Sequence, residues 1–216
     1  MISHGQIIAV YLMASDIERH NGATFYSQAQ TISAEIAADC SLSLATVAGV
    51  VAALSPNNRW ERNIVDARRL CSAYVAGGAD HAATIKVATF NGNKRKAIAI
   101  LAGADPLSVL GGLKVRAFYS AIMGEDAIVV DGHAYAIWRG ERIPTSSTPK
   151  ISPKLYSAIV ADYRRAADAL SLVIGSPISA VTVQATTWLV WRRMTAGKRK
   201  PRKASGKPRK AVGGRS

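Results

Sequence analysis

LSVLGGLKVRAFYSAIMGEDAIVVDGHAYAIW, residues 107–138, is the stretch that decides the fold expected of this chain. The adjacent glycines Gly111 and Gly112 predict a tight turn, because glycine adopts positive φ at little cost. Apolar residues at helical spacing follow the turn, from Val115 to Met123. The stretch therefore predicts a short helix, a glycine turn, a second helix, a loop and a third helix.

One carboxylate stands out in this stretch. The apolar run 127–130 ends at Asp131, so we expect a buried segment that delivers the carboxylate to the mouth of a cleft. The residue is either catalytic or the N-cap of a helix that begins near Ala134. The 4 histidines are scattered without zinc spacing, and no phosphate-binding glycine loop lies between a strand and a helix. We expect no metal and no cofactor.

Two segments, LGGLKVR (110–116) and VDGH (130–133), resemble the helix-hairpin-helix DNA glycosylases. The hairpin of that family reads approximately Leu-Pro-Gly-Val-Gly-Arg-Lys and is followed by Val-Asp-Thr-His. There the hairpin amides bind a DNA phosphate, and the Asp stabilises the sugar cation that forms as the base leaves. The resemblance covers about residues 40–140. It implies that Asp131 is the catalytic carboxylate and Gly112 the first hairpin glycine.

Three positions depart from the pattern of that family. Gly111 replaces the proline, Lys114 stands where the second glycine belongs, and Arg116 replaces the lysine that forms a Schiff base in some members. The resemblance thus implies that the hairpin residues Gly111, Gly112, Lys114 and Arg116 contact DNA. It also implies base excision without Schiff-base strand cleavage, unless Lys114 supplies the amine, which makes Lys114 a second catalytic candidate.

Further DNA contacts are indicated outside the hairpin. Asn57 or Asn58, at a helix end, is either the wedge that enters the DNA stack in this superfamily or part of a plain capped turn. The basic run Lys94, Arg95 and Lys96 at a helix start opposes the helix dipole, so it either binds phosphate or is a solvated turn. His133 is either a phosphate contact or a helix-start residue without a catalytic role.

The charge of the chain indicates a polyanionic partner. Its formal net charge is +14, and nine Lys/Arg with no acid fall in residues 195–216. We expect a helical domain over 1–194 and a disordered basic tail over 195–216, in which Lys198, Arg199 and Lys200 contact DNA without reading its sequence. A tail that only improves solubility is the alternative. We expect DNA as the partner, no membrane span and a monomer.

Composition indicates an all-α protein. Strand signals are few and 49% of the chain is hydrophobic, so we expect a glycosylase-like helical bundle, as two lobes with a cleft if the resemblance holds. Expected helices include residues 3–20, ended by Asn21-Gly22; a central, buried helix over 44–54; and a last helix begun by Ser176-Pro177. Only two cysteines, each in a helical pattern, suit reduced core thiols in the cytoplasm, or in a host cytoplasm for a viral protein.

Three functions remain open at this point. The first is a monofunctional DNA N-glycosylase that acts on a modified or damaged base flipped into a pocket. The second is a non-catalytic helix-hairpin-helix DNA-binding module on the same scaffold. The third is a base-modifying enzyme of the type found in bacterial viruses. Separately, a C-terminal pattern, VQA (183–185) followed by Trp188 and Trp191, resembles the C-terminus of small uncharacterised proteins of bacterial viruses, and this resemblance implies no activity.

Overall fold

The computed structural model describes residues 3–196, and all of its regular structure is helical. The chain is therefore all-α over this range, as its composition predicted. The elements are α1 (Ser3–Leu12), α2 (Asp16–Cys40), α3 (Leu44–Leu54), α4 (Trp60–Thr84), α5 (Asn91–Leu101), α6 (Pro106–Val109), α7 (Leu113–Ile122), α8 (Gly132–Arg139), the 3-10 turn η1 (Thr145–Ser147), α9 (Pro153–Ile174) and α10 (Ala180–Ala196).

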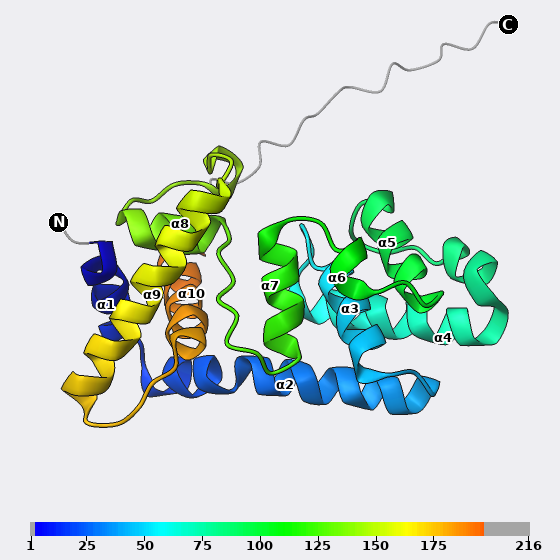
Figure 1. Ribbon diagram of the computed structural model, residues 1–216, viewed down its shortest axis with the longest axis horizontal. Coiled ribbons are helices and arrows are strands. Elements are labelled where there is room, and N and C mark those ends of the chain that lie inside the picture. Colours follow the sequence, from blue (N-terminus) through cyan, green and yellow to red (C-terminus); the bar gives the residue numbers. More distant parts are fainter. Residues whose placement is uncertain (1–2, 197–216) are drawn as a thin grey trace, which may run out of the picture.

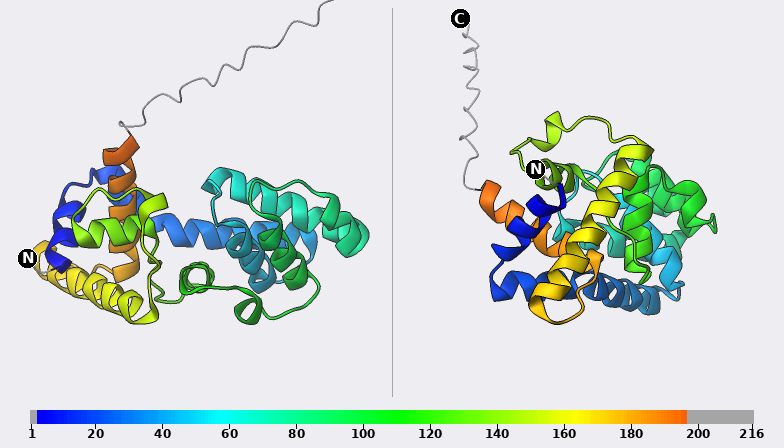
Figure 2. Two further views of the ribbon diagram at one scale, coloured as in Figure 1. Left: turned by 90° about the horizontal axis from the view of Figure 1, so that it is seen from above. Right: turned by 60° about the vertical axis from the view of Figure 1, so that its left-hand side comes forward.

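The helices form two lobes that α2 joins. In Figure 1, α3–α7 lie on one side and α1, α8, α9 and α10 on the other, with α2 running beneath both. We call these the middle lobe and the terminal lobe, and each has its own cluster of buried apolar side chains. The second half of α2 contributes Ile36 and Cys40 to the core of the middle lobe. The left view of Figure 2, seen from above, shows the same division.

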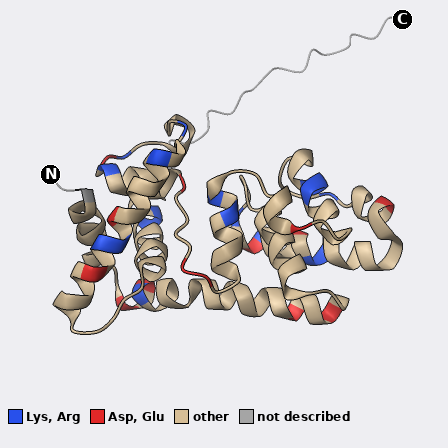
Figure 3. Ribbon diagram, viewed as in Figure 1, with Lys and Arg blue, Asp and Glu red and all other residues tan. Residues whose placement is uncertain are grey.

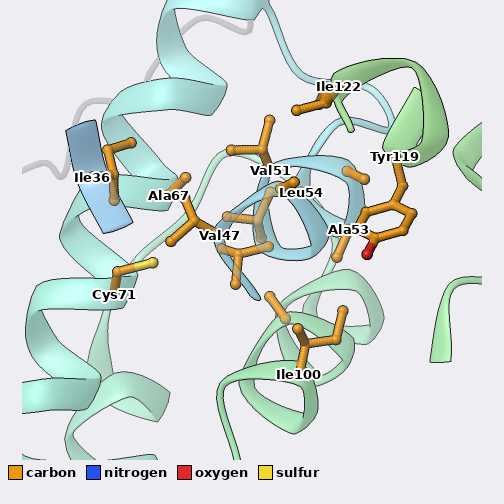
Figure 4. Close-up of a cluster of buried hydrophobic side chains, with 14 of the residues drawn as sticks. Ile36, Val47, Val51, Ala53, Leu54, Ala67, Cys71, Ile100, Tyr119 and Ile122 are labelled. Carbon is orange, nitrogen blue, oxygen red and sulfur yellow. The ribbon is translucent and has the colours of Figure 1, made fainter. Parts of the chain in front are cut away.

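Helix α3 is the centre of the middle lobe. Every residue from Val47 to Leu54 is buried, and the side chains of the surrounding helices pack around it (Figure 4). Ser43 caps the helix by accepting the Thr46 N–H at 3.0 Å. A Cβ at Gly49 would lie 3.1 Å from side-chain atoms of Ile100 and Pro106, so the glycine allows α5 and α6 to approach. The predicted central helix over 44–54 is confirmed.

The apolar run before Asp131 passes between the two lobes. Ile128 and Val130 belong to the core of the terminal lobe, whereas Val129 belongs to that of the middle lobe. This alternation is what an extended chain produces when both of its faces are covered. The run therefore ties the lobes together and ends where they meet.

The N-terminal prediction of one helix ending at Asn21-Gly22 is wrong. The chain breaks instead at residues 13–15, where Ser15 and Glu18 form a capping box that starts α2. Gly22 lies inside α2, at its crossing with α10, and a Cβ there would lie 2.1 Å from Thr186 Oγ1. This glycine serves a close helix contact, which sequence alone does not distinguish from a helix end.

The C-terminal prediction also needs correction. The last helix begins at Ala180, and Ser179, not Ser176, accepts the N–H of Thr182 at 3.1 Å. The helix continues to Ala196, so the first two residues of the predicted tail are helical and the rest lie outside the described residues.

Two further expectations concern the thiols and the membrane. Cys40 and Cys71 are buried free thiols, and burial raises the pKa of Cys71 to about 12. Within residues 3–196, no single helix is long and apolar enough to cross a membrane; the pair α2 and α3, bent by 117°, meets the length and composition requirement only when taken together.

Candidate active site between the lobes

A cavity of about 560 Å³ lies where the two lobes and α2 meet. Its walls come from α2, the α3–α4 turn, α7, the start of α8, the loop around η1, and α10. The lining residues include Phe25, Tyr26, Asn57, Asn58, Arg59, Trp60, Asn63, Lys114, Phe118, Asp131, His133, Thr145, Thr148, Gln184, Trp188 and Arg192. The structure thus brings Asp131, Lys114, His133 and both asparagines of the α3–α4 turn to one cavity.

Asp131 is held by N–H donors from two elements. Its Oδ1 accepts from the backbone N–H groups of His133 and Ala134, both at 2.9 Å, so Asp131 is the N-cap of α8. Its Oδ2 accepts from Trp188 Nε1 at 3.3 Å. The side chain remains half-buried and lines the cavity, so it is neither sealed in the core nor remote from the hairpin.

The segment that delivers Asp131 is fixed by one tyrosine of α9. The Tyr156 hydroxyl donates to the Ile128 carbonyl at 2.9 Å and accepts the Val130 N–H at 3.2 Å. Two backbone groups beside the carboxylate are thereby satisfied by the terminal lobe. The carboxylate is placed by a rigid support and not by a free loop.

Aromatic rings form most of the apolar wall of the cavity. Phe25 lies 5.4 Å from Trp60 and 6.2 Å from Trp188, and Trp60 lies 6.4 Å from Phe118, as ring-centroid distances. Such rings offer flat faces on which a planar base can stack. Trp188, which sequence analysis left without a role in the site, is both a wall of this cavity and a hydrogen-bond donor to Asp131.

The glycine turn lies at the start of α7, beside the cavity. Gly111 and Gly112 are exposed, and Gly112 has φ +79°, which explains why glycine is needed there. Gly112 is the N-cap residue of α7 and provides no side-chain cap. A Cβ at Gly111 would lie 2.9 Å from Lys96 Nζ, so that ammonium group stands beside the turn. Uncapped amides with a neighbouring cation are suited to an anion.

Lys114 and Arg116 have different surroundings on the first turn of α7. Lys114 lines the cavity, and its ammonium has no hydrogen bond or ion pair with any of residues 3–196. Arg116 turns back, and its Nε donates to the Leu110 carbonyl at 2.9 Å. The lysine therefore faces the site, while the arginine stabilises the turn and does not line the cavity.

The charges around the cavity are mostly positive. Among the described lining residues, Arg59, Lys114 and Arg192 are cationic and Asp131 alone is acidic. The Arg192 guanidinium lies 4.5 Å from the centre of the Trp188 ring. Figure 3 shows Lys and Arg on α5, at the start of α7 and around the α8–η1 loop, whereas Asp and Glu of α2 lie along the opposite edge.

The two asparagines of the α3–α4 turn are not equivalent. Asn57 is exposed at φ +57°, at the tip of the turn. Asn58 donates from Nδ2 to Asp66 Oδ2 at 3.3 Å, and the fully buried Asp66 carboxylate also accepts the Ala88 N–H at 2.7 Å. Asn57 is thus the residue that is free to contact a ligand, and Asn58 anchors the turn.

Of the basic run on α5, Lys94 is compensated within the protein. Lys94 Nζ donates to the carbonyl groups of Ala83 at 2.6 Å and Ile85 at 3.1 Å, at the C-terminal end of α4. Arg95 is exposed and, like Lys94 and Lys96, does not line the cavity. Lys198, Arg199 and Lys200 lie outside the described residues.

A hydrogen-bonded pair in the cavity wall was not anticipated from the sequence. The Tyr26 hydroxyl of α2 donates to Gln184 Oε1 of α10 at 2.8 Å. Burial raises the pKa of Tyr26 well above its ordinary value, and the nearby charge of Asp131 raises it further. Tyr26 is therefore a neutral donor at physiological pH. Residues 158 positions apart make this contact, and no local pattern predicts it.

The fold and the cavity define a class: a two-lobed, all-α protein with an aromatic, cation-rimmed pocket that contains one carboxylate. Within that class, the chain belongs to the Family of unknown function (DUF7178), whose model matches residues 3–195. The comparisons with curated proteins and with solved structures found no match.

Proposed function

We propose that this protein binds duplex DNA and acts on a nucleotide flipped into the cavity between the lobes, in the manner of a monofunctional DNA N-glycosylase of the helix-hairpin-helix type. The observation that carries the proposal is the position of Asp131. The carboxylate and the unpaired Lys114 ammonium line the same aromatic cavity, next to the exposed glycine turn. A base, a sugar and a phosphate each need one of these features.

Each part of the site has a role in this reaction. The amides of Gly111–Leu113, with Lys96 and Lys114, hold the phosphate, and the exposed Asn57 fills the gap that the extruded nucleotide leaves. The aromatic rings stack on the base. Asp131 offsets the positive charge that grows on the sugar as the C1′–N bond breaks. Water adds to C1′, the base leaves with a proton, and an abasic site remains.

The hydrogen bonds of Asp131 are compatible with both a cap and a catalytic group. Two of its three donors are backbone N–H groups of α8, and these satisfy only one carboxylate oxygen. The other oxygen accepts a hydrogen bond from Trp188 Nε1. Asp131 caps α8 and is also half-exposed in an aromatic cavity, so its carboxylate can contact a bound nucleotide as well. A purely structural cap needs no such cavity.

The test is base release from duplexes that carry a panel of damaged or modified bases. Asp131→Asn keeps the N-cap, because Asn caps helices as well as Asp does, but removes the charge. We expect base release to fall about 100-fold or more, the size typical of a lost electrostatic contact in a transition state. Asp126→Asn is the matched control. It neutralises an exposed acid on the segment that leads to Asp131, where Asp126 pairs with Arg164 of α9, and it should leave base release unchanged.

The other outcomes separate the alternatives. Binding without release or modification by the wild-type protein supports a non-catalytic module. A changed nucleoside mass with an intact glycosidic bond supports a base-modifying enzyme. Lys114→Ala should weaken DNA binding; an unchanged affinity would remove the hairpin from the site. Borohydride trapping of a covalent complex, lost in Lys114→Ala, would replace the monofunctional mechanism by one with a Schiff base.

A further inference from the structure

Gln184 presents an unused hydrogen-bond donor in the cavity wall. The residue is only 4% exposed and lies on α10, one turn before Trp188. Its Oε1 accepts from the Tyr26 hydroxyl at 2.8 Å, whereas its Nε2 donates to no atom of residues 3–196. Because Gln184 lines the cavity, this NH₂ group can donate to an acceptor on a bound ligand.

The orientation of this amide is set by the tyrosine. The Tyr26 proton has no acceptor among the described residues other than Gln184 Oε1. If the amide were reversed, the nitrogen would face the hydroxyl and the tyrosine proton would lose its partner. The carbonyl therefore faces Tyr26, and the NH₂ group is left to the cavity.

The position of Gln184 determines which part of a nucleotide it meets. The cations Arg59 and Arg192 are exposed at the rim, and Lys114 lies on the exposed start of α7. The sugar and phosphate belong there, so the edge of the base furthest from the sugar reaches the buried wall. At this edge thymine and guanine carry a carbonyl acceptor, and cytosine and adenine carry an amino donor.

We propose that Gln184 selects keto bases: the cavity accepts a flipped base with a carbonyl at pyrimidine position 4 or purine position 6, and rejects the corresponding amino base. This inference rests on the proposed function and adds the substrate class. An amino base would place two donors against each other and leave both unpaired. Sites that read a substrate group by hydrogen bonding discriminate strongly against an analogue that cannot reproduce the bond.

The experiment compares two keto bases with the corresponding amino bases. Uracil is compared with cytosine, and hypoxanthine with adenine; the members of each comparison differ mainly in the carbonyl or amino group at pyrimidine position 4 or purine position 6. Each base is placed opposite an abasic-site analogue in the same duplex, so that pairing strength does not differ between them. Affinity of the full-length protein is measured by fluorescence anisotropy. We expect each keto base to be bound at least about tenfold more tightly than its amino partner.

Variants locate the preference in the amide. Gln184→Leu removes the donor at similar volume and should bring both affinity ratios close to one. Gln28→Leu, on an exposed position of α2, is the matched control and should keep them. If Gln184→Leu does not fold, judged by its circular dichroism melting curve, Tyr26→Phe serves instead: it leaves the amide free to reverse and should also lower the ratios.

The failures are distinguishable. Equal affinity for all four bases, or a preference for the amino bases, overturns the role of Gln184 while DNA binding with a flipped base stands. Uniform weakening by Gln184→Leu also overturns it, because the donor then contacts sugar or phosphate, which carry no base identity. If the protein binds none of these duplexes better than a fully paired one, the flipped-nucleotide proposal fails as well.

Discussion

Single residues in this protein often serve two neighbours at once. Asp131 caps α8 with one oxygen and receives the Trp188 indole on the other. Glu18 bonds the N–H of Ser15 at 2.9 Å and forms an ion pair with Arg193 at 2.7 Å, which joins the start of α2 to the end of α10. Sequence analysis found Asp131 because an apolar run precedes it. It could not find Trp188, 57 residues away, because that contact is made only by folding.

The Glu18–Arg193 pair predicts a pH dependence of stability. The hydrogen bond from Arg193, more than any other contact, lowers the pKa of Glu18 below its ordinary value of 4.5. A carboxyl group whose pKa is lowered by folding stabilises the protein above its ordinary pKa, and this contribution is lost as the pH falls through the lowered value. We expect the free energy of unfolding to decrease between about pH 5 and pH 3.

Urea denaturation at a series of pH values measures this dependence. Glu18→Gln keeps the hydrogen-bonding groups of the capping box but cannot titrate, so its unfolding free energy should change less over this range than that of the wild type. Parallel pH profiles for the two proteins would show that the ion pair does not contribute.

At the level of elements, the contact between α2 and α10 joins the site to the fold. These helices carry Tyr26 and Gln184 on facing sides and cross at Gly22, where the backbone of Thr186 comes within 2.7 Å of a Cβ position. The crossing distance therefore sets the separation of two walls of the cavity. A side chain at residue 22 has to force the helices apart.

Gly22→Ala should consequently destabilise the protein by about 1–3 kcal/mol, the range found for overpacked cores. Gly5→Ala is the matched control, because a Cβ at this exposed helical position meets nothing within 4 Å. It should be neutral or stabilise the protein by up to about 1 kcal/mol, since alanine favours the helix over glycine. Urea unfolding midpoints compare the two; equal stability of both variants would show that α2 and α10 separate easily.

Local chemistry predicted some elements well and others badly. The sequence alone predicted the apolar, buried helix α3 and the glycine turn before α7. Asn21-Gly22 and Ser176-Pro177 were misleading. Both contain residues that commonly end or start helices. In the structure, however, Gly22 lies inside α2 at its contact with α10, and Ser179 caps the last helix in place of Ser176. The polar wall of the cavity, from Gln184 to Tyr26, has no local signature.

On the scale of the whole molecule, charge is concentrated in the C-terminal residues. The net charge of +14 falls to +5 without the nine basic residues after Ala196. Each phosphate neutralised by such a residue releases counterions, and the affinity for DNA then depends steeply on salt. In the proposed complex with DNA, this term strengthens binding to any sequence and leaves selection of the base to the cavity.

A chain that ends at Ala196 should show a weaker salt dependence. The slope of log affinity against log salt should become less negative by several units, and by at most about 8 if all nine charges contact phosphate. A full-length chain with the same nine residues replaced by glutamine should behave like the shortened one. Identical slopes for these proteins and the wild type would show that the basic residues act only on solubility.

The arrangement of the two cores has a consequence for biosynthesis. The middle lobe is built from one continuous stretch, whereas the terminal lobe combines α1 with α8–α10. A ribosome releases the N-terminal part first, so the middle lobe has all of its residues while α9 and α10 are still being made. Phe25 and Trp188 line the same cavity, so the cavity between the lobes is complete only after α10, the last helix, has been synthesised.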